Sequence, residues 1–393
     1  MLQVPTEYVP GYAKAREVDP ERADRYIAHT MIGDPLADRA VASFADITQR
    51  EMHQLIAAGM NRDENVFRDA PQELRDLFNA SENTPDWFYD HPVYPGCRLF
   101  HSSPDRFLTA FAAGAIVQGF TTRISKSFTT TGRILDRGVH RLAQNIKHLY
   151  EIMIPEGLER DGEGWKLSVR IRLIHGQMRQ LFAKSGQWDT EAYGVPLHAA
   201  HIGLASALFS EQLMAHTRRL GVRMTTEERA SFMHIWRCSA WLMGVPETIL
   251  FDSESDAAEL GRIGLLCEPP PDVDAIIVGN VIINSAALVA HVLEPAERQA
   301  LTNQGYRISR AFIGNELADQ LEFPKQRSFY ILPALRLERQ VNKVIDQLLP
   351  ARAATRKAQA LDSLLNAATP DDSAVGISYR LPVTIGDDPS KPW

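Results

Sequence analysis

Histidine and arginine side chains gather on residues 165–182, a segment with helical spacing. His175 shares a helical face with Ile171, Met178 and Phe182, at distances of four, three and seven residues. A histidine within an apolar stripe is either a buried neutral side chain bonded to a carbonyl or a ligand of haem iron. Iron ligation requires a neutral imidazole, with its other ring nitrogen held by an acceptor, in a dry pocket. The spacing alone leaves both interpretations open.

Three arginines surround this histidine: Arg170, Arg172 and Arg179. A planar guanidinium is well matched to carboxylates such as the propionates of a haem. Gly176, which follows His175, would let a flat cofactor approach the backbone. The alternative for each arginine is an ordinary solvated basic face.

A second helical segment, residues 134–154, carries a line of polar side chains on an otherwise apolar pattern. Arg141, Gln144, Asn145 and His148 lie at spacings of three, four and seven residues. If this line faces a haem, Arg141 would stabilise a developing negative oxygen and Asn145 or Gln144 would hydrogen-bond it. His148 would then be a second ligand or an acid–base group. The alternative is a solvent-exposed face.

His198 and His201 form a further pair, three residues apart and therefore near one helical face, as in some metal sites. No carboxylate or cysteine lies close by in the sequence, and no HExxH or ExxH motif occurs. The pair is therefore interpreted as polar lining of a substrate pocket, or as polar residues with satisfied hydrogen bonds at the start of a helix. Both interpretations are preferred to a non-haem metal site.

Composition excludes several classes of protein. The chain has 393 residues, of which 45% are hydrophobic and 23% charged, as in an ordinary globular protein. Its net charge of −7 provides no global attraction for nucleic acid or an anionic membrane. Cys97, Cys238 and Cys267 are widely spaced, which excludes a disulfide framework, a zinc ribbon, a cysteine-ligated iron–sulfur cluster and a c-type haem attachment. The N-terminus does not resemble a signal peptide, so the cytoplasm is the expected compartment.

Helical spacing runs through almost the whole chain, and alternating strand patterns are scarce. One helical stripe is predicted over residues 36–56, with Asp34 as its N-cap and Pro35 in the first turn. Helix starts are also predicted at Ser103 and at Thr225. Further helices are predicted over residues 272–293, 295–311 and 334–349.

These patterns predict an all-α protein with a single large helical domain. No glycine-rich phosphate loop or GxSxG turn occurs, which argues against nucleotide-binding α/β folds and serine hydrolases. The apolar run over residues 275–293 contains asparagine, serine and histidine and is predicted to be a core helix, not a membrane span. The expected organisation is an N-terminal arm over residues 1–30, the domain over 31–350, and a C-terminal helix and extended tail over 351–393.

Several blocks of sequence together resemble a known family. They are GDPLAD at 33–38, SPDRFLTAFAAGAIVQGF at 103–120, VRIRLIHGQMR at 169–179, YGVPLHAAHIGLASALFS at 193–210, LGVRMTTEERASFMHIWRCSAWLMGVP at 220–246 and GNELADQLEFP at 314–324. In order and spacing these blocks resemble the family that contains the bacterial latex-clearing rubber oxygenases and the MpaB-like fungal oxygenase of mycophenolate biosynthesis.

This resemblance implies an all-α fold with a globin-like core and one non-covalent b-type haem. The histidine of the family's RLxHxxxR block is its proximal iron ligand, and it falls on His175. The reaction implied is dioxygen-dependent oxidative cleavage of carbon–carbon double bonds in isoprenoid chains.

The chain departs from the family pattern at two places. The rubber oxygenases carry an arginine followed by lysine and threonine three and four residues later, whereas here Gln144 and Asn145 follow Arg141. Glutamine supplies no cation and cannot ligate ferric iron as a lysine amine can. In the YGVPLHAAH block at 193–201, the family usually has Asn-Gln and an acidic residue after the proline, whereas this chain has Leu197, His198, Ala199, Ala200 and His201.

The resulting expectation is a haem-dependent oxygenase that acts on a hydrophobic small molecule, with an isoprenoid or other unsaturated chain as one option. One alternative is a haem peroxidase or peroxygenase-type tailoring enzyme on the same scaffold. Another is a non-catalytic haem- or lipid-binding helical protein. Dioxygen or peroxide is the expected co-substrate, and the chain is expected to be a monomer or homodimer.

Overall fold

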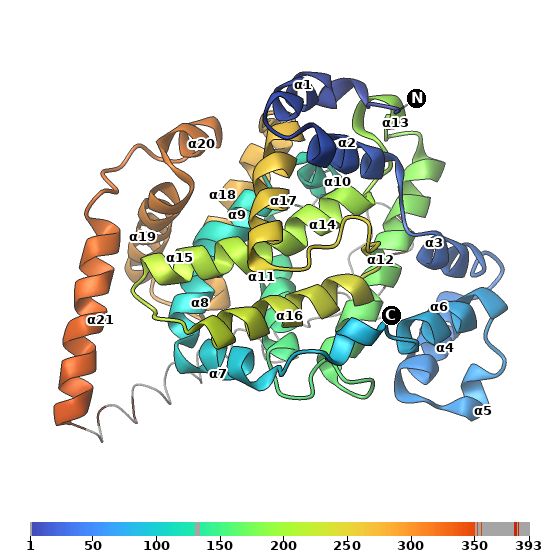
Figure 1. Ribbon diagram of the computed structural model, residues 1–393, viewed down its shortest axis with the longest axis horizontal. Coiled ribbons are helices and arrows are strands. Elements are labelled where there is room, and N and C mark those ends of the chain that lie inside the picture. The colour runs from blue at the N-terminus through green and yellow to red at the C-terminus, as the bar shows by residue number, and fades with distance from the viewer. Residues whose placement is uncertain are drawn as a thin grey trace.

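The predicted all-α architecture is confirmed. A computed structural model of the chain describes residues 2–129 and 134–349, together with residues 352, 355, 381, 382 and 384. Within these residues the elements are helices, and no strand occurs (Figure 1). Most of the C-terminal tail expected from about residue 369 lies outside the described residues.

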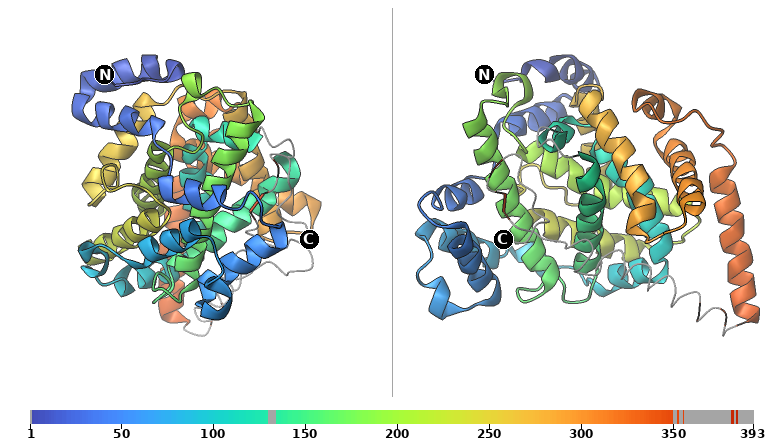
Figure 2. Two further views of the ribbon diagram at one scale, coloured as in Figure 1. Left: turned by 90° about the vertical axis from the view of Figure 1, so that its right-hand side faces the viewer. Right: turned by 180° about the vertical axis from the view of Figure 1, so that it is seen from behind.

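The centre of the molecule consists of long helices that pack against one another. They are α11 (Ile134–Ile152), α12 (Glu163–Ser185), α14 (Ala199–Ala207), α16 (Thr226–Leu242) and α18 (Val273–Val289). Helix α11 packs against α18 and α12, and α12 also contacts α16. Figure 2 (right) shows α11 and α12 in the green part of the chain from behind. The core helix predicted over residues 272–293 is confirmed as α18, which ends four residues earlier than expected.

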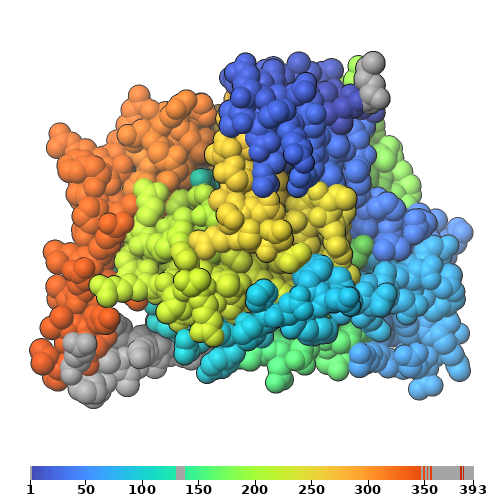
Figure 3. All heavy atoms as spheres, in the orientation of Figure 1, coloured from blue at the N-terminus to red at the C-terminus, as the bar shows by residue number. Residues whose placement is uncertain are grey.

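The first thirty residues are mostly helical. Helices α1 (Val9–Val18) and α2 (Pro20–Ala28) pack against α17 (Glu254–Cys267). Figure 3 shows this contact on one face of the molecule, with the blue N-terminal helices against the yellow segment that contains α17. The short helices η1 (Thr6–Tyr8) and η2 (His29–Met31) flank α1 and α2.

The single stripe predicted over residues 36–56 is wrong as one helix, because it divides into α3 (Pro35–Ala42) and α4 (Gln49–Asn61). Thr48 caps the second helix by accepting a hydrogen bond from the Glu51 N–H. The predicted N-cap at Asp34 is confirmed, since its carboxylate accepts hydrogen bonds from the first turn of α3. The start at Thr225 is also confirmed, with a complete capping box.

Two π-helical segments interrupt the helices around the core. Helix α8 (Pro104–Ala110) begins after Ser103 as predicted and continues through η4 (Phe111–Ala115) into α9 (Ile116–Gly119). Likewise, η6 (Leu208–Gln212) joins α14 to α15 (Leu213–Arg219), and η4 packs against η6. Such segments change the phase of the helical faces on either side, which periodicity does not indicate.

The C-terminal part forms one flank of the molecule (Figure 1, orange). It comprises α19 (Pro295–Ile313), α20 (Asn315–Gln320) and α21 (Ile331–Leu348), with α21 packed on α19. The remaining elements are α5 (Glu64–Phe67), α6 (Gln72–Glu82), η3 (Asp86–Tyr89), α7 (Tyr94–Ser102), η5 (Arg123–Ser125), α10 (Lys126–Thr129) and α13 (Thr190–Tyr193).

Across the described ranges, no single helix has both the length and the apolar composition needed to cross a membrane. One bent pair, Pro104–Gly119 and Arg123–Thr129 at 91° to each other, meets these two criteria together.

Candidate functional site

A cavity lies between α11 and α12 and is closed by parts of α10, α14 and α16. The cavity volume open to the centre of a water molecule is about 220 Å³. The total space not filled by protein atoms is about 1440 Å³, which includes the part open to solvent. Its apolar lining includes Phe120, Ile124, Phe128, Ile171, Ile174, Met178, Leu197, Ile202, Phe209, Trp236 and Met243. Its larger polar side chains are His140, Arg141, Gln144, Asn145, His148 and His175. A mostly apolar wall with a few polar groups is typical of a cofactor or substrate site.

His175 reaches this cavity from α12 on the apolar face predicted from the sequence. Ile171 and Met178 line the cavity beside it, whereas Phe182 is fully buried against Trp188. Burial, reinforced by the charge of Arg179, lowers the pKa of His175 to about 3, so the imidazole is neutral at pH 7.

The two ring nitrogens of His175 have different surroundings. Nδ1 is buried without a hydrogen-bond partner, which leaves Nε2 as the nitrogen available to the cavity. The acceptor that usually orients a metal-ligating histidine is therefore absent from the described residues around His175.

His148 reaches the cavity from α11 and has a fixed tautomer. Its Nε2 lies 3.0 Å from Ser168 Oγ and 3.2 Å from Ser239 Oγ. Ser168 Oγ already donates to the Gly164 carbonyl at 2.7 Å, so it accepts from His148 Nε2–H. The lone pair of His148 is therefore on Nδ1, and burial lowers the pKa of this imidazole to about 4.

The whole predicted polar line of α11 faces the cavity. The guanidinium carbon of Arg141 lies 3.9 Å from the centre of the Phe128 ring, and Asn145 Nδ2 donates to the Arg141 carbonyl at 2.9 Å. His140 also lines the cavity, although the sequence analysis missed it. Its spacing of four and eight residues from Gln144 and His148 would have placed it on the same face.

The arginines around His175 do not reach the cavity. Arg172 forms a buried pair with Asp34, with Nε–Oδ2 at 2.5 Å and Nη2–Oδ1 at 3.0 Å. Burial alone would raise the pKa of Asp34, but the charge and hydrogen bonds of Arg172 outweigh it and lower that pKa. Arg179 pairs with Asp38 at 2.6 Å, and half-buried Arg170 is absent from the lining. Arg172 and Arg179 therefore hold α3 on α12, and Arg141 is the guanidinium that lines the cavity.

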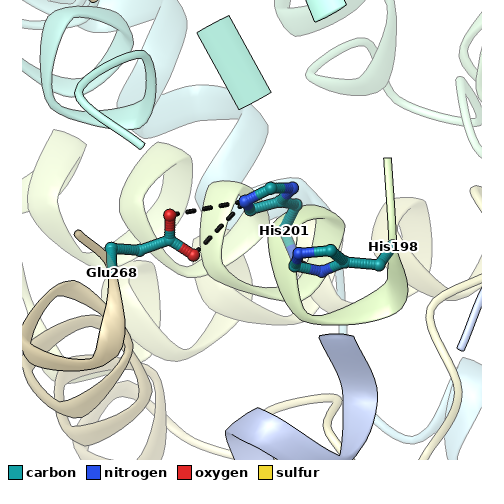
Figure 4. Close-up of side chains that lie close together, drawn as sticks. All are labelled: His198, His201 and Glu268. Atoms are coloured by element: carbon teal, nitrogen blue, oxygen red, sulfur yellow. Dashed lines mark hydrogen bonds and ion pairs between the residues drawn. The ribbon is translucent and has the colours of Figure 1, made fainter. Parts of the chain in front are cut away.

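His198 and His201 lie outside the cavity lining, although their neighbours Leu197 and Ile202 belong to it. Both histidines are buried beside Glu268, as Figure 4 shows, and the ligand atoms of the three residues lie within 4.8 Å of one another. This carboxylate lies 67 residues away from His201 along the chain, so sequence spacing did not indicate it.

The tautomers of this cluster favour a hydrogen-bond network over a metal site. His198 Nδ1 accepts a hydrogen bond from the His201 N–H at 3.0 Å, so Nε2 of His198 carries the proton. His201 Nε2 lies 3.2 Å from Glu268 Oε1, where an N–H is stabilised by the carboxylate. A metal needs lone pairs at its ligands, whereas His198 directs its Nε2–H at Tyr8 and His201 directs its own at Glu268.

Comparison with known proteins gives concordant matches. The family model described as "ER-bound oxygenase mpaB/B'/Rubber oxygenase, catalytic domain" matches residues 99–343, more than half of the chain. A rubber oxygenase from Streptomyces sp. (strain K30) is 25% identical over 318 residues, which cover 79% of this chain and 73% of the relative. The solved structure of the latex clearing protein LCP in the closed state has a TM-score of 0.65 and 17% identity, and covers 86% of this chain and 91% of that one. This structural likeness shows a shared fold.

Proposed function

Since the chain belongs to the family of the mpaB/B' and rubber oxygenase catalytic domains, we propose that it is an oxygenase whose cavity holds a b-type haem on His175. The observation that carries this proposal is a neutral, cavity-facing imidazole in an otherwise apolar wall, opposite a second wall with polar groups. When bound, the haem would supply the redox chemistry that activates dioxygen or peroxide.

The imidazole of His175 fits such a group in its charge state, although its Nδ1 lacks, among the described residues, the acceptor that usually orients an iron-ligating histidine. The cavity volume of about 220 Å³ lies somewhat below the roughly 300–1,000 Å³ usual for ligand sites, so the lining side chains would have to yield to admit a haem. Nε2 of His175 is available as a ligand, and the imidazole needs to lose no proton to bind a metal at neutral pH. Arg172 is held by both carboxylate oxygens of Asp34, and Arg179 pairs with Asp38 through Nε, while Nη2 of Arg179 is buried without a partner among the described residues.

The α11 wall provides the groups that would act on the oxidant. Arg141 supplies a cation where negative charge develops on oxygen, and the Asn145 and Gln144 amides add polar contacts beside it. His148, neutral at pH 7 with its lone pair on Nδ1, would accept a proton and not donate one. The apolar remainder of the wall would bind the substrate and exclude water.

We infer that the substrate is a hydrophobic small molecule and that an unsaturated or isoprenoid chain suits the cavity best. Its wall is aliphatic and aromatic, with no charged group among the residues that α12, α14 and α16 contribute. Oxidative cleavage of a carbon–carbon double bond is the reaction that kinship with a rubber oxygenase favours.

A peroxidase or peroxygenase activity is the second candidate. One observation favours it: the α11 wall combines a neutral imidazole with an accessible lone pair and a guanidinium. These groups suit the activation of a peroxide, for which one group takes the proton and the other stabilises the negative charge.

The absorption spectrum of the purified protein tests the haem assignment. We expect a Soret band that shifts on reduction and on binding of carbon monoxide, and that is lost in His175→Ala. His234→Ala is the matched control, because His234 is also buried but bonds the Phe88 carbonyl away from the cavity. A His175→Ala protein with the full native spectrum would show that another residue holds the haem.

Turnover then separates the two activities. Oxidation of a polyunsaturated substrate that requires dioxygen supports the oxygenase, whereas turnover only with hydrogen peroxide supports the peroxygenase. A stable haem spectrum without turnover under either condition would indicate a binding protein.

A further inference from the structure

Glu268, the residue directly after α17, is a buried carboxylate that joins distant segments of the chain. Oε1 accepts a hydrogen bond from the Tyr26 hydroxyl at 2.6 Å, and Oε2 accepts one from the Arg123 backbone N–H at 3.1 Å. His201 Nε2 lies 3.2 Å from Oε1. The donors thus come from α2, η5 and α14.

Tyr8 adds a fourth segment, η1, to the same network. Its hydroxyl lies 3.2 Å from His198 Nε2 and 3.0 Å from His201 Nε2. Since His198 Nε2 carries a proton, it donates to the Tyr8 oxygen. Burial and the nearby Glu268 raise the pKa of the Tyr8 phenol well above its usual value, so the phenol keeps its proton, which it donates toward Glu268.

The carboxylate of Glu268 remains ionised in this interior. Burial alone would raise its pKa, but the charge and hydrogen bond of His201, with the hydrogen bonds from Tyr26 and Arg123, outweigh burial and lower it. A buried carboxylate with several donors is strongly held, because removal of any donor leaves part of the charge unsatisfied.

Two of the segments held by Glu268 also form walls of the cavity. Helix α14 carries His201 and contributes the lining residue Ile202. Helix η5 begins at Arg123 and contributes the lining residue Ile124. The Arg123 side chain further pairs with Glu7 and Asp272, which fixes η5 to the N-terminal segment and to the start of α18.

We propose that Glu268 is a positioning residue of the cavity: its carboxylate fixes η5 and α14, two walls of the cavity, relative to each other and couples them to the N-terminal helices. The proposal rests on the proposed function only in taking this cavity as the reaction site. Its test requires neither haem nor substrate, so the two can fail independently.

Hydrogen–deuterium exchange of the purified full-length Glu268→Gln protein tests this role. A carboxamide has one acceptor oxygen. Its NH₂ group would face N–H and O–H groups that now donate hydrogen bonds to the Glu268 carboxylate. Exchange should rise about tenfold or more in residues 123–129 and 197–207, and in α2, while α18 keeps its protection. Glu211→Gln is the matched control, because Glu211 is also a buried glutamate, and its hydrogen-bond and ion-pair partners among the described residues are Gln212 and Arg218.

A positioning role and a general contribution to stability give different patterns. A uniform rise in exchange over all helices, or no rise at all, would overturn the proposal. So would a stoichiometric metal in the native protein that Glu268→Gln loses, since the carboxylate would then be a ligand. Glu268→Asp, which keeps the charge, should restore part of the protection.

Tyr26→Phe provides a milder variant if Glu268→Gln does not fold. It removes one hydroxyl that donates to Glu268 and retains the ring. Loosening of residues 197–207 in this variant would show that the effect travels through the carboxylate, because Tyr26 lies on α2. Exchange that rises in α2 alone would contradict the coupling.

Discussion

At the scale of single residues, local hydrogen bonds decide what the histidines can do. His148 directs a lone pair to the cavity because two serines hold its Nε2, and His175 leaves Nε2 to the cavity because its Nδ1 is buried. His198 and His201 instead direct N–H groups at Tyr8 and Glu268. Residue type alone makes all four equivalent candidate ligands, whereas their tautomers assign two to the cavity and two to a network.

Arg141 is the cavity residue whose replacement should separate binding from chemistry. We expect Arg141→Ala to retain the haem spectrum and to lose about 10²–10³ in turnover, as is usual when a preorganised donor to developing negative charge is removed. Arg262→Ala on the exposed face of α17 is the control and should turn over normally. Steady-state rates at saturating substrate measure the effect, and an unchanged rate would assign this role to another group on α11.

At the scale of elements, buried ion pairs fix how the helices cross. Asp34 caps α3 and at the same time pairs with Arg172 of α12, 138 residues away. Gly176 allows this contact to be close, because a Cβ there would lie 3.1 Å from the Ala37 carbonyl oxygen. Helix α12, and with it His175, is thus held against α3 by charge on one side and by a small residue on the other.

Asp34→Asn tests the buried pair separately from the helix cap. Asparagine also caps helices, so the change leaves the cap but removes the charge that faces Arg172. An unpaired buried guanidinium costs roughly 3–5 kcal/mol of stability, which urea unfolding measures. Glu259→Gln, in an exposed pair with Arg262, is the control and should be near neutral. Equal effects of the two variants would contradict the importance of the Asp34–Arg172 pair.

At the scale of the whole molecule, buried neutral histidines make stability depend on pH. His216 is a case outside the cavity lining: burial lowers its pKa to about 3, and it stacks on Phe312 and bonds Gln118. Between about pH 6.5 and 3 the unfolded chain binds a proton at this position that the folded chain does not. Stability therefore falls as the pH decreases through this window, by up to ~1.4 kcal/mol per pH unit for each such group.

His216→Gln should make this acid sensitivity smaller. Glutamine does not titrate, so the free energy of unfolding should decline less steeply from pH 6.5 to pH 5 than in the native protein, by up to ~1.4 kcal/mol per unit. Urea unfolding at several pH values measures the slope. A slope identical to that of the native protein would mean that His216 is protonated in the folded state.

Local patterns along the chain were enough to predict most of the helices, their inward faces and the family. Period 3.6 is a local property, so it placed His175 and the polar line of α11 on the sides that meet at the cavity. Capping signals located the starts of α3 and α16 for the same reason. The start of α4 also has a local signal, Thr48 followed by Glu51, which was overlooked. The π-helical segments have no such signal, because they depend on how neighbouring helices pack.

Which polar groups meet depends on how the helices pack in three dimensions. Glu268 joins His201 across 67 residues, and the direction in which α14 packs turns His198 and His201 away from the cavity. Arg172 is paired with Asp34 and not directed at a cofactor, because α3 packs against α12. Contacts between elements depend on the crossing angle and distance of two helices, and spacing along either one contains neither quantity.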